Sequence, residues 1–224
     1  MPRRARIVIP GIPHHVVQRG NRRGNVFFDD DDRIFYLERL NEYCQKWHVD
    51  VLAYCLMTNH VHLVLKPETE SGLQDVLKPL HMRHSQRINK ARNWSGHLWQ
   101  GRFFSSPLDD AYTWSAIRYV ERNPVVAGLV EKAEEYRWSS AAAHCGLTKD
   151  PMLLPLPEIG NAIPTNKWAD WLAVSGDEQT TRILQRNFEK GIPCGSENFI
   201  DRLEKLANRE LKYRPQGRPC SNKG

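Results

Sequence analysis

Two histidines placed two residues apart are the clearest candidates for chemistry in this sequence. His60 and His62 lie in a run of β-branched and aliphatic residues, so on a β-strand both imidazoles project from the same face. Imidazole is a common ligand of divalent metals, and two neighbouring rings form half of a metal site. Buried strands also carry histidines that are hydrogen-bonded core residues, so the pair by itself leaves both interpretations open.

A second pair of polar residues has the spacing of one helical turn. Tyr119 and Asn123 are four residues apart, so on a helix they share a face. The Asn123 carbonyl oxygen is an acceptable third ligand for a hard divalent cation, and the Tyr119 phenol can act as a nucleophile. If this helix packs on the histidine strand, the tyrosine can attack a phosphate whose oxygen is polarised by the metal, and hold the DNA end as an ester.

A second tyrosine competes for the role of nucleophile. Tyr112 lies seven residues before Tyr119, two helical turns earlier on the same face, but its register with Asn123 is poor. Tyr119 is therefore the predicted nucleophile, and Tyr112 is expected to pack or to contact DNA. The ordinary pKa of tyrosine is about 10, so the phenol needs activation, for which a metal-bound water and a nearby lysine are both open.

Hydrophobic periodicity predicts the elements that position these residues. A hairpin closed by Thr58–Asn59 is the clearest local pattern. The order strand, helix, strand, strand, helix, strand, helix predicts an α+β fold in which helices cover one face of an antiparallel sheet. The predicted strands are His14–Arg19, Val49–Met57, His60–Leu65 and Leu98–Leu108, and the predicted helices are 29–47, 73–93, 109–122 (ended by Asn123–Pro124) and 136–144.

The composition changes after residue 145, which divides the chain into parts. Residues 1–145 are predicted to form the main domain, and residues 146–166, rich in Pro, Gly and Asn, a linker. Residues 167–211 contain two predicted helices around a tight turn, compatible with a small helix-turn-helix-like module. Residues 212–224 form a basic tail. The chain is therefore expected to carry a small C-terminal helical appendage on its α+β core.

The net charge of +6 is concentrated in blocks. Residues 1–25 carry six arginines and no acidic residue, and residues 78–102 carry six Lys or Arg and no acidic residue. A third basic block, residues 202–224, ends the chain. Blocks of one sign suit a polyanion, because each neutralised phosphate releases condensed counterions. Solvated faces are the alternative for any single block, but three together favour nucleic acid.

Basic residues in these blocks are predicted to contact DNA. Some follow the first strand on a Gly-flanked loop, some lie with His81 and His84 on one face of the 73–93 helix, one is interleaved with aromatic residues, and some belong to an extended tail resembling a minor-groove AT-hook. The predicted DNA-binding residues are Arg19, Arg22, Arg23, Arg83, Arg87, Lys90, Arg102, Arg214 and Arg218.

Composition excludes several classes of protein. At 40% hydrophobic and 26% charged residues the chain can bury a core, so wholesale disorder is not expected. No apolar run is long enough to cross a bilayer, and no signal peptide is recognised. Five scattered cysteines without CxxC spacing exclude a disulfide scaffold and a cysteine-rich zinc site. The expected location is the cytoplasm, without a membrane partner.

Four segments together resemble a known family. HHVVQRGNRRGNVFF (14–28), LMTNHVHLVLKP (56–67), LWQGRFFSSPL (98–108) and YVERNPVVAGLV (119–130) are similar to segments of the REP-associated tyrosine transposases. These are single-tyrosine HUH endonucleases of the IS200-like superfamily. The resemblance covers residues 5–145 in order, and the combination of NHVHLVL with YVERNPVVAGLV is highly specific.

The resemblance implies a ferredoxin-like sheet, the HUH nuclease core, and assigns roles. His60 and His62 are then metal ligands for Mg²⁺ or Mn²⁺, Tyr119 is the nucleophile, and Asn123 stands where insertion-sequence relatives carry a glutamine ligand. Family members cut single-stranded DNA at hairpins of repetitive extragenic palindromes (REP), leaving a 5′-phosphotyrosine. Insertion-sequence relatives exchange the tyrosine helix within a dimer, and a monomer with its own tyrosine is the alternative. A domesticated protein that binds palindromic DNA without cutting it, and a nuclease using water as nucleophile, are the rival functions.

Overall fold

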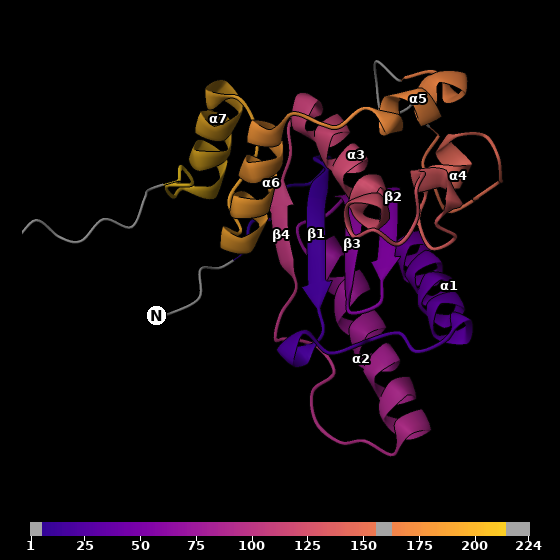
Figure 1. The fold of residues 1–224 in the computed structure, drawn as a ribbon. Coiled ribbons are helices and arrows are strands. Elements are labelled where there is room, and N and C mark those ends of the chain that lie inside the picture. Colours follow the sequence, from indigo (N-terminus) through magenta and orange to yellow (C-terminus); the bar gives the residue numbers. More distant parts are fainter. Residues whose placement is uncertain (1–5, 156–162, 214–224) are drawn as a thin grey trace, which may run out of the picture.

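The computed structural model describes residues 6–155 and 163–213. In chain order the first elements are β1 (His14–Arg19), the short 3₁₀ helix η1 (Asn21–Arg23), α1 (Asp30–Lys46), β2 (Val49–Met57), β3 (His60–Pro67), α2 (Gly72–Arg92), β4 (Phe104–Pro107) and α3 (Asp110–Val126). They are followed by η2 (Ala133–Glu135), α4 (Ala141–His144), η4 (Thr165–Lys167), α5 (Trp168–Ala173), α6 (Glu178–Lys190) and α7 (Glu197–Ala207). Figure 1 shows the sheet at the centre with helices around it.

The four strands form one antiparallel sheet in the order β2-β3-β1-β4. Strand β3 lies between β1 and β2, so the β1–α1–β2 connection is split by an antiparallel strand, as in ferredoxin-like folds. The register pairs Arg19 with His60 and Val17 with His62. The predicted α+β fold with a ferredoxin-like antiparallel sheet is confirmed.

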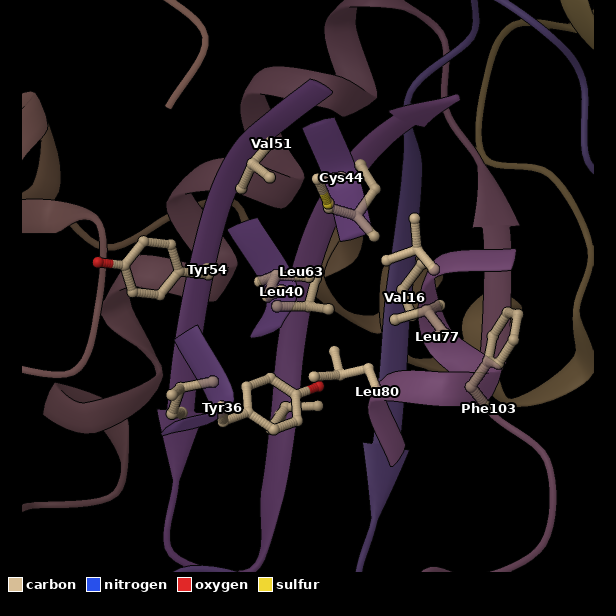
Figure 2. Packing of buried hydrophobic residues seen from close by; sticks show 14 of the residues in the cluster. Val16, Tyr36, Leu40, Cys44, Val51, Tyr54, Leu63, Leu77, Leu80 and Phe103 are labelled. Carbon is tan, nitrogen blue, oxygen red and sulfur yellow. The ribbon is translucent and has the colours of Figure 1, made fainter. Parts of the chain in front are cut away.

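Helices α1 and α2 cover one face of the sheet. Asp29 caps α1 by accepting a hydrogen bond from the Asp32 amide, so the helix begins where the acidic run predicted it. Tyr36 and Leu40 of α1 and Leu77 of α2 are fully buried in one core with the odd-numbered residues of β3, such as Leu63. Figure 2 shows these side chains meeting between the helices and the strands.

Helix α3 covers the opposite face, so the prediction that helices cover only one face was wrong. Ala116, Ile117 and Val120 of α3 are fully buried and pack with Val64 of β3. Alternation along β3 places His60 and His62 on this same face, because side chains two apart on a strand point the same way. The strand pattern was nearly continuous in hydrophobicity, which is typical of a sheet buried on both faces.

Three predicted boundaries change in the structure. Strand β4 spans only Phe104–Pro107, because the chain turns at Gly101, which has a left-handed backbone (φ +67). Before this turn Trp99 packs on α2, where its Nε1 donates to the His81 carbonyl at 3.1 Å. Helix α3 continues through Pro124 to Val126, since a proline one turn from the end removes a single helical hydrogen bond. Between η2 and α4 the chain lies along β2, with the Leu56 amide donating to the Trp138 carbonyl at 2.8 Å.

The C-terminal segment packs on the same face of the sheet as α3. Trp168 of α5 is fully buried in one core with Ile117 and Val120, and Phe188 of α6 packs edge-on against His15 at 5.2 Å between ring centroids. Helices α5 and α6 thus share the core of the α+β domain. The predicted division at residues 145, 166 and 211 stays a prediction, and part of the linker (156–162) and most of the tail (214–224) lie outside the described residues.

Candidate active site between β3 and α3

The sheet brings two histidines and an arginine to one end of the α3 face. His60 and His62 lie on β3, with their ring centroids 4.9 Å apart and their planes nearly perpendicular. Arg19, at the end of β1, is the register partner of His60 and so points from the same face. This part of the sheet carries the polar residues, whereas Val64, one step further along β3, belongs to the core.

One ring nitrogen of each histidine is already hydrogen-bonded. His60 Nδ1 lies 2.6 Å from the Asn59 Oδ1, which accepts its proton. His62 Nδ1 lies 3.0 Å from His15 Nε2, and these two rings stack at 5.2 Å between centroids. In both histidines Nε2 is therefore the nitrogen available to a ligand, and the Nδ1 partner fixes the ring orientation, as in protein metal sites.

Helix α3 carries the predicted tyrosine to these histidines. Asp109 caps the helix through the Tyr112 amide at 2.9 Å, and the buried stripe on α3 fixes its rotation on the sheet. Tyr119 is half-buried, with its ring 5.5 Å from His62 and 5.7 Å from His15, edge-on to both. Within this one chain, His15, His62 and Tyr119 thus lie side by side.

Asn123 lies one turn after Tyr119 and reaches the first histidine. Asn123 and His60 line one cavity, and the contact of Asn123 with the His60 ring offsets a part of the lowering of the His60 pKa by desolvation and Arg19. This contact depends on α3 continuing past the boundary predicted at residue 122. The structure therefore brings together His60, His62, Tyr119 and Asn123, the four residues that the sequence proposed for one site.

These side chains line a cavity of about 610 Å³ between α3 and the C-terminal helices. Its far wall consists of Trp171 and residues 175–185, from α5, α6 and their connection. Arg118 and Arg122 of α3 hold this wall, because their guanidinium groups donate to carbonyls at the end of α5, among them Trp171 O at 2.6 Å. The volume is in the range of small-molecule and active sites.

Burial keeps the imidazoles of this site neutral. Desolvation, reinforced by the charge of Arg19, lowers the pKa of His60 to about 4. The pKa of His62 is lowered well below its ordinary value, chiefly by desolvation and further by His15, His60 and Arg19. Desolvation alone lowers the pKa of His15 to about 3. Neutral imidazole is the form that binds metal, so these shifts favour a ligand role at neutral pH.

The rival tyrosine is placed less favourably. Tyr112 packs with the core on the α3 face, and it is not among the residues that line the cavity around the histidines. Desolvation, with Cys194 and Asp109, raises the pKa of Tyr112, so its phenolate is disfavoured. The geometry thus favours Tyr119, as the spacing from Asn123 indicated.

The predicted DNA-binding residues are distributed over several surfaces. Arg19 lines the cavity of the candidate site, and Arg22 and Arg23 are exposed in η1, both with left-handed backbone (φ +54 and +60). Such strain in two successive non-glycine residues is typical of functional loops. The others are exposed Arg83 and Lys90, Arg87 paired with Asp32 at 3.3 Å, and exposed Arg102, while Arg214 and Arg218 lie outside the described residues.

The predicted basic face of α2 needs a correction. His81 and His84 are buried, with His81 hydrogen-bonded to Tyr36 Oη at 3.0 Å and His84 to the Val26 carbonyl at 2.7 Å. They belong to the helical stripe that packs on the sheet, and burial lowers the pKa of His81 to about 3 and of His84 to about 4. They are therefore neutral core residues and contribute no charge toward DNA.

Three residues important for the site were not found from the sequence. His15 was not assigned to the site from the sequence, and it is buried against His62 and Tyr119. The signal available in the sequence was the spacing of four residues between His15 and Arg19 on β1, which places both side chains on the same face of the sheet. Phe188 of α6 packs on both His15 and His62. Glu121 is fully buried on α3 and accepts from Trp168 Nε1 at 2.8 Å, which ties α5 to the tyrosine helix.

No group of three or more His, Cys, Asp or Glu side chains with the arrangement of a metal site occurs in the described part of the chain. A metal held by His60 and His62 would need a third ligand of another kind, and the Asn123 amide oxygen is a donor of that kind. No described helix is long and apolar enough to span a bilayer.

The sequence model of the family "Transposase IS200 like" matches residues 9–123, about half of the chain and all four residues of the site. The chain belongs to the IS200-like transposase family. Its members are DNA transposases. The matched segment ends at Asn123, so the C-terminal helices that form the far wall of the cavity lie outside it.

Solved structures support the fold of this IS200-like protein. The structure "of the REP associates tyrosine transposase bound to a REP hairpin" superposes with a TM-score of 0.52 at 15% identity, covering 69% of this chain and 98% of the other. A Deinococcus radiodurans R1 protein described as a transposase gives 18% identity over 54% of this chain and 97% of the other, and its TM-score of 0.38 is too low to carry weight. No curated protein matches the sequence.

Proposed function

We propose that this protein is a metal-dependent, site-specific endonuclease and strand-transferase for single-stranded DNA, with Tyr119 as the nucleophile. The observation that carries the proposal is the placement of the half-buried Tyr119 ring 5.5 Å from His62, in the cavity that also contains His60 and Asn123. Core histidines without a catalytic role would not require an open cavity of about 610 Å³ in front of them.

A divalent cation, Mg²⁺ or Mn²⁺, fits the side chains of this cavity. Both histidines have Nδ1 engaged, by Asn59 and His15, so each can offer a neutral Nε2 to a cation. Asn123 lines the same cavity and adds an oxygen donor, which gives the mixed nitrogen and oxygen set that such cations accept. A cation held there would supply positive charge for a phosphate oxygen and lower the barrier to attack on phosphorus.

The remaining chemistry belongs to the protein. The Tyr119 oxygen forms a bond to phosphorus as the bond to the 3′-oxygen breaks, the phenol proton is lost, and the leaving 3′-oxygen takes up a proton. The phosphotyrosine ester conserves the energy of the phosphodiester, so rejoining the DNA ends needs no ATP. Arg19, at the cavity and beside His60, provides a fixed positive charge for the phosphate.

REP-like hairpins are the proposed substrates. The support is the solved transposase of the same fold, which is bound to a REP hairpin, together with the basic blocks of this chain. A folded palindrome presents both a duplex stem and unpaired flanks, and exposed Arg22 and Arg23, on the loop that follows β1, can contact the phosphates of such a structure.

The test is capture of the covalent ester. Wild-type protein incubated with a labelled REP-like hairpin and Mn²⁺ should give a band of protein–DNA adduct on a denaturing gel, and mass spectrometry should place the ester on Tyr119. Tyr119→Phe should bind the hairpin with unchanged affinity and give no adduct, and the matched variant Tyr112→Phe should keep it.

Other results would select the rival functions. Cleavage by wild type that yields free 5′-phosphate ends and no adduct would identify water as the nucleophile. Binding without cleavage on every hairpin would identify a domesticated DNA-binding protein, and an adduct retained by Tyr119→Phe would disprove the assignment of the nucleophile.

A further inference from the structure

A second cavity lies on the face of the sheet opposite the candidate active site. It has a volume of about 640 Å³ and lies between α2 and residues 96–103, the segment that leads into β4. Figure 1 shows α2 on the far side of the sheet from α3, so this cavity and the Tyr119 cavity are separated by the strands. Its size is in the range of ligand sites, and the proposed strand chemistry makes no use of it.

The cavity is positively charged. Arg6, Lys78 and Arg102 line it, and none of the described residues that line it is acidic. The guanidinium of Arg6 lies 3.7 Å above the Phe103 ring, and its Nε donates to the Phe103 carbonyl at 3.1 Å. Arg6 and Arg102 both line the cavity, and desolvation together with the nearby charge of Arg102 lowers the pKa of Arg6 to about 10. Such an arrangement favours an anion between them.

The wall of the cavity contains a buried acceptor without a partner. The Gln18 side chain is 2% exposed, and its Nε2 donates to the Gly101 carbonyl at 3.2 Å. Its Oε1 is buried and accepts no hydrogen bond from the described residues. A buried acceptor of this kind costs folding free energy unless something satisfies it, and Gln18 is among the residues that line the cavity. A ligand with an N–H group would satisfy it.

We propose that this cavity binds one unpaired nucleotide of single-stranded DNA. Its phosphate lies between Arg6 and Arg102, and its base lies among the apolar and aromatic residues, with an exocyclic amino group donating to Gln18 Oε1. The side-chain inventory favours a nucleotide over an acidic peptide, because the cavity is also lined by apolar side chains, the half-exposed Met82 and the largely buried Trp99 and Phe103, against which a base can pack. This inference rests on the proposed action on single-stranded DNA and specifies where a part of that DNA is read.

The surroundings favour a nucleotide within a strand over a free mononucleotide. A second hollow adjoins the cavity and shares Asn89, His97 and Leu98 with it. Trp94 lines this second hollow, is 52% exposed and packs edge-on against Phe28. An exposed tryptophan beside a basic cavity is a suitable surface for the neighbouring base of the same strand.

The test is a thermodynamic cycle between DNA positions and cavity residues. The substrates are hairpins with unpaired flanks on both sides, and each carries one abasic site at a different flank position. Their affinity for the protein is measured by fluorescence anisotropy in EDTA. In wild-type protein one flank position should cost about tenfold in affinity when its base is removed. Thymine at that position, which lacks an exocyclic amino group, should cause part of the same loss.

The cavity variants should abolish this dependence. In Gln18→Met, which removes the acceptor at similar length, the abasic penalty should fall below about twofold. Arg102→Ala, a change at an exposed position that leaves the core intact, should weaken all flanked hairpins by about tenfold and reduce the same penalty. The control Lys149→Ala removes one exposed charge near the β2 edge and should keep the full penalty.

The inference would be overturned if the abasic penalty were equal in the wild type, both cavity variants and the control. It would also be overturned if no flank position were sensitive to base removal, or if the protein did not bind the hairpins. The outcome is separable from that of the proposed function. A wild-type adduct on Tyr119 without coupling to Gln18 or Arg102 would refute only the nucleotide site. Coupling without an adduct would refute only the tyrosine chemistry.

Discussion

A buried carboxylate on the tyrosine helix allows a quantitative prediction of stability. Glu121 is 0% exposed and accepts three hydrogen bonds: Oε1 from Ser140 Oγ at 2.5 Å and His144 Nδ1 at 2.6 Å, and Oε2 from Trp168 Nε1 at 2.8 Å. The three donors come from the start of α4, from α4 itself and from α5. The carboxylate therefore fastens both helices to α3 two residues after Tyr119.

Glu121→Gln changes the hydrogen bonding at nearly constant volume. An amide has one acceptor oxygen, so the best orientation keeps the Ser140 and His144 bonds and turns the amide N–H₂ toward the indole N–H of Trp168. One charge-assisted hydrogen bond is lost, worth about 1.5–3 kcal/mol, and a fully buried indole donor is left without an acceptor, at about 1–3 kcal/mol. Allowing for partial relaxation, the free energy of unfolding should fall by about 3 kcal/mol.

Urea denaturation followed by circular dichroism measures this loss, and a thermal scan should show a decrease of Tm by about 6–12 °C for a chain of this size. Glu131→Gln is the matched control, because it makes the same chemical change at an exposed residue and should stay within about 0.5 kcal/mol. A loss below about 1 kcal/mol in Glu121→Gln would show that the cluster does not stabilise the fold as its geometry indicates.

Three further predictions concern pH, the metal and the tail. Burial lowers the pKa of His81 to about 3 and of His84 to about 4, so the neutral rings stabilise the fold fully above their ordinary pKa of 6.5 and this contribution is lost as the pH falls. At about pH 5 each histidine should lower the free energy of unfolding by about 2 kcal/mol relative to about pH 7.5. Equal urea midpoints at the two pH values would contradict this. His15→Phe removes the hydrogen-bond partner of His62 and should weaken Mn²⁺ binding roughly 10–100-fold in calorimetry; unchanged affinity would exclude an orienting role. Deleting residues 212–224 should weaken hairpin binding and flatten its salt dependence, and an unchanged salt slope would show that the tail takes no part.

The arrangement of the C-terminal helices has a consequence for the substrate. Trp171 and residues 175–185 form one wall of the Tyr119 cavity, and Arg118 and Arg122 hold the end of α5 through its carbonyls. A DNA strand that reaches Tyr119 through this cavity would therefore lie between α3 and this wall. The sequence model of the family ends at Asn123, before these helices.

The sequence by itself determined the features that depend on local periodicity. The two-residue spacing of His60 and His62 placed them on one face of β3, and the four-residue spacing of Tyr119 and Asn123 placed them on one face of α3. The order of strands and helices, with the hairpin of β2 and β3, was sufficient for the α+β fold. These properties follow from backbone geometry within each element, and neighbouring residues are enough to reveal them.

Only the tertiary structure decided which faces meet. Packing between segments far apart in the chain places α3 on the face of the sheet that carries the histidines. It also makes His15 the hydrogen-bond partner of His62 and brings Phe188 of α6 against the His62 ring. The same holds for His81 and His84, which read as part of a basic face and are buried because α2 turns that side to the sheet. A local pattern fixes which side chains share a face, but the element that covers the face is selected by long-range burial of apolar surface.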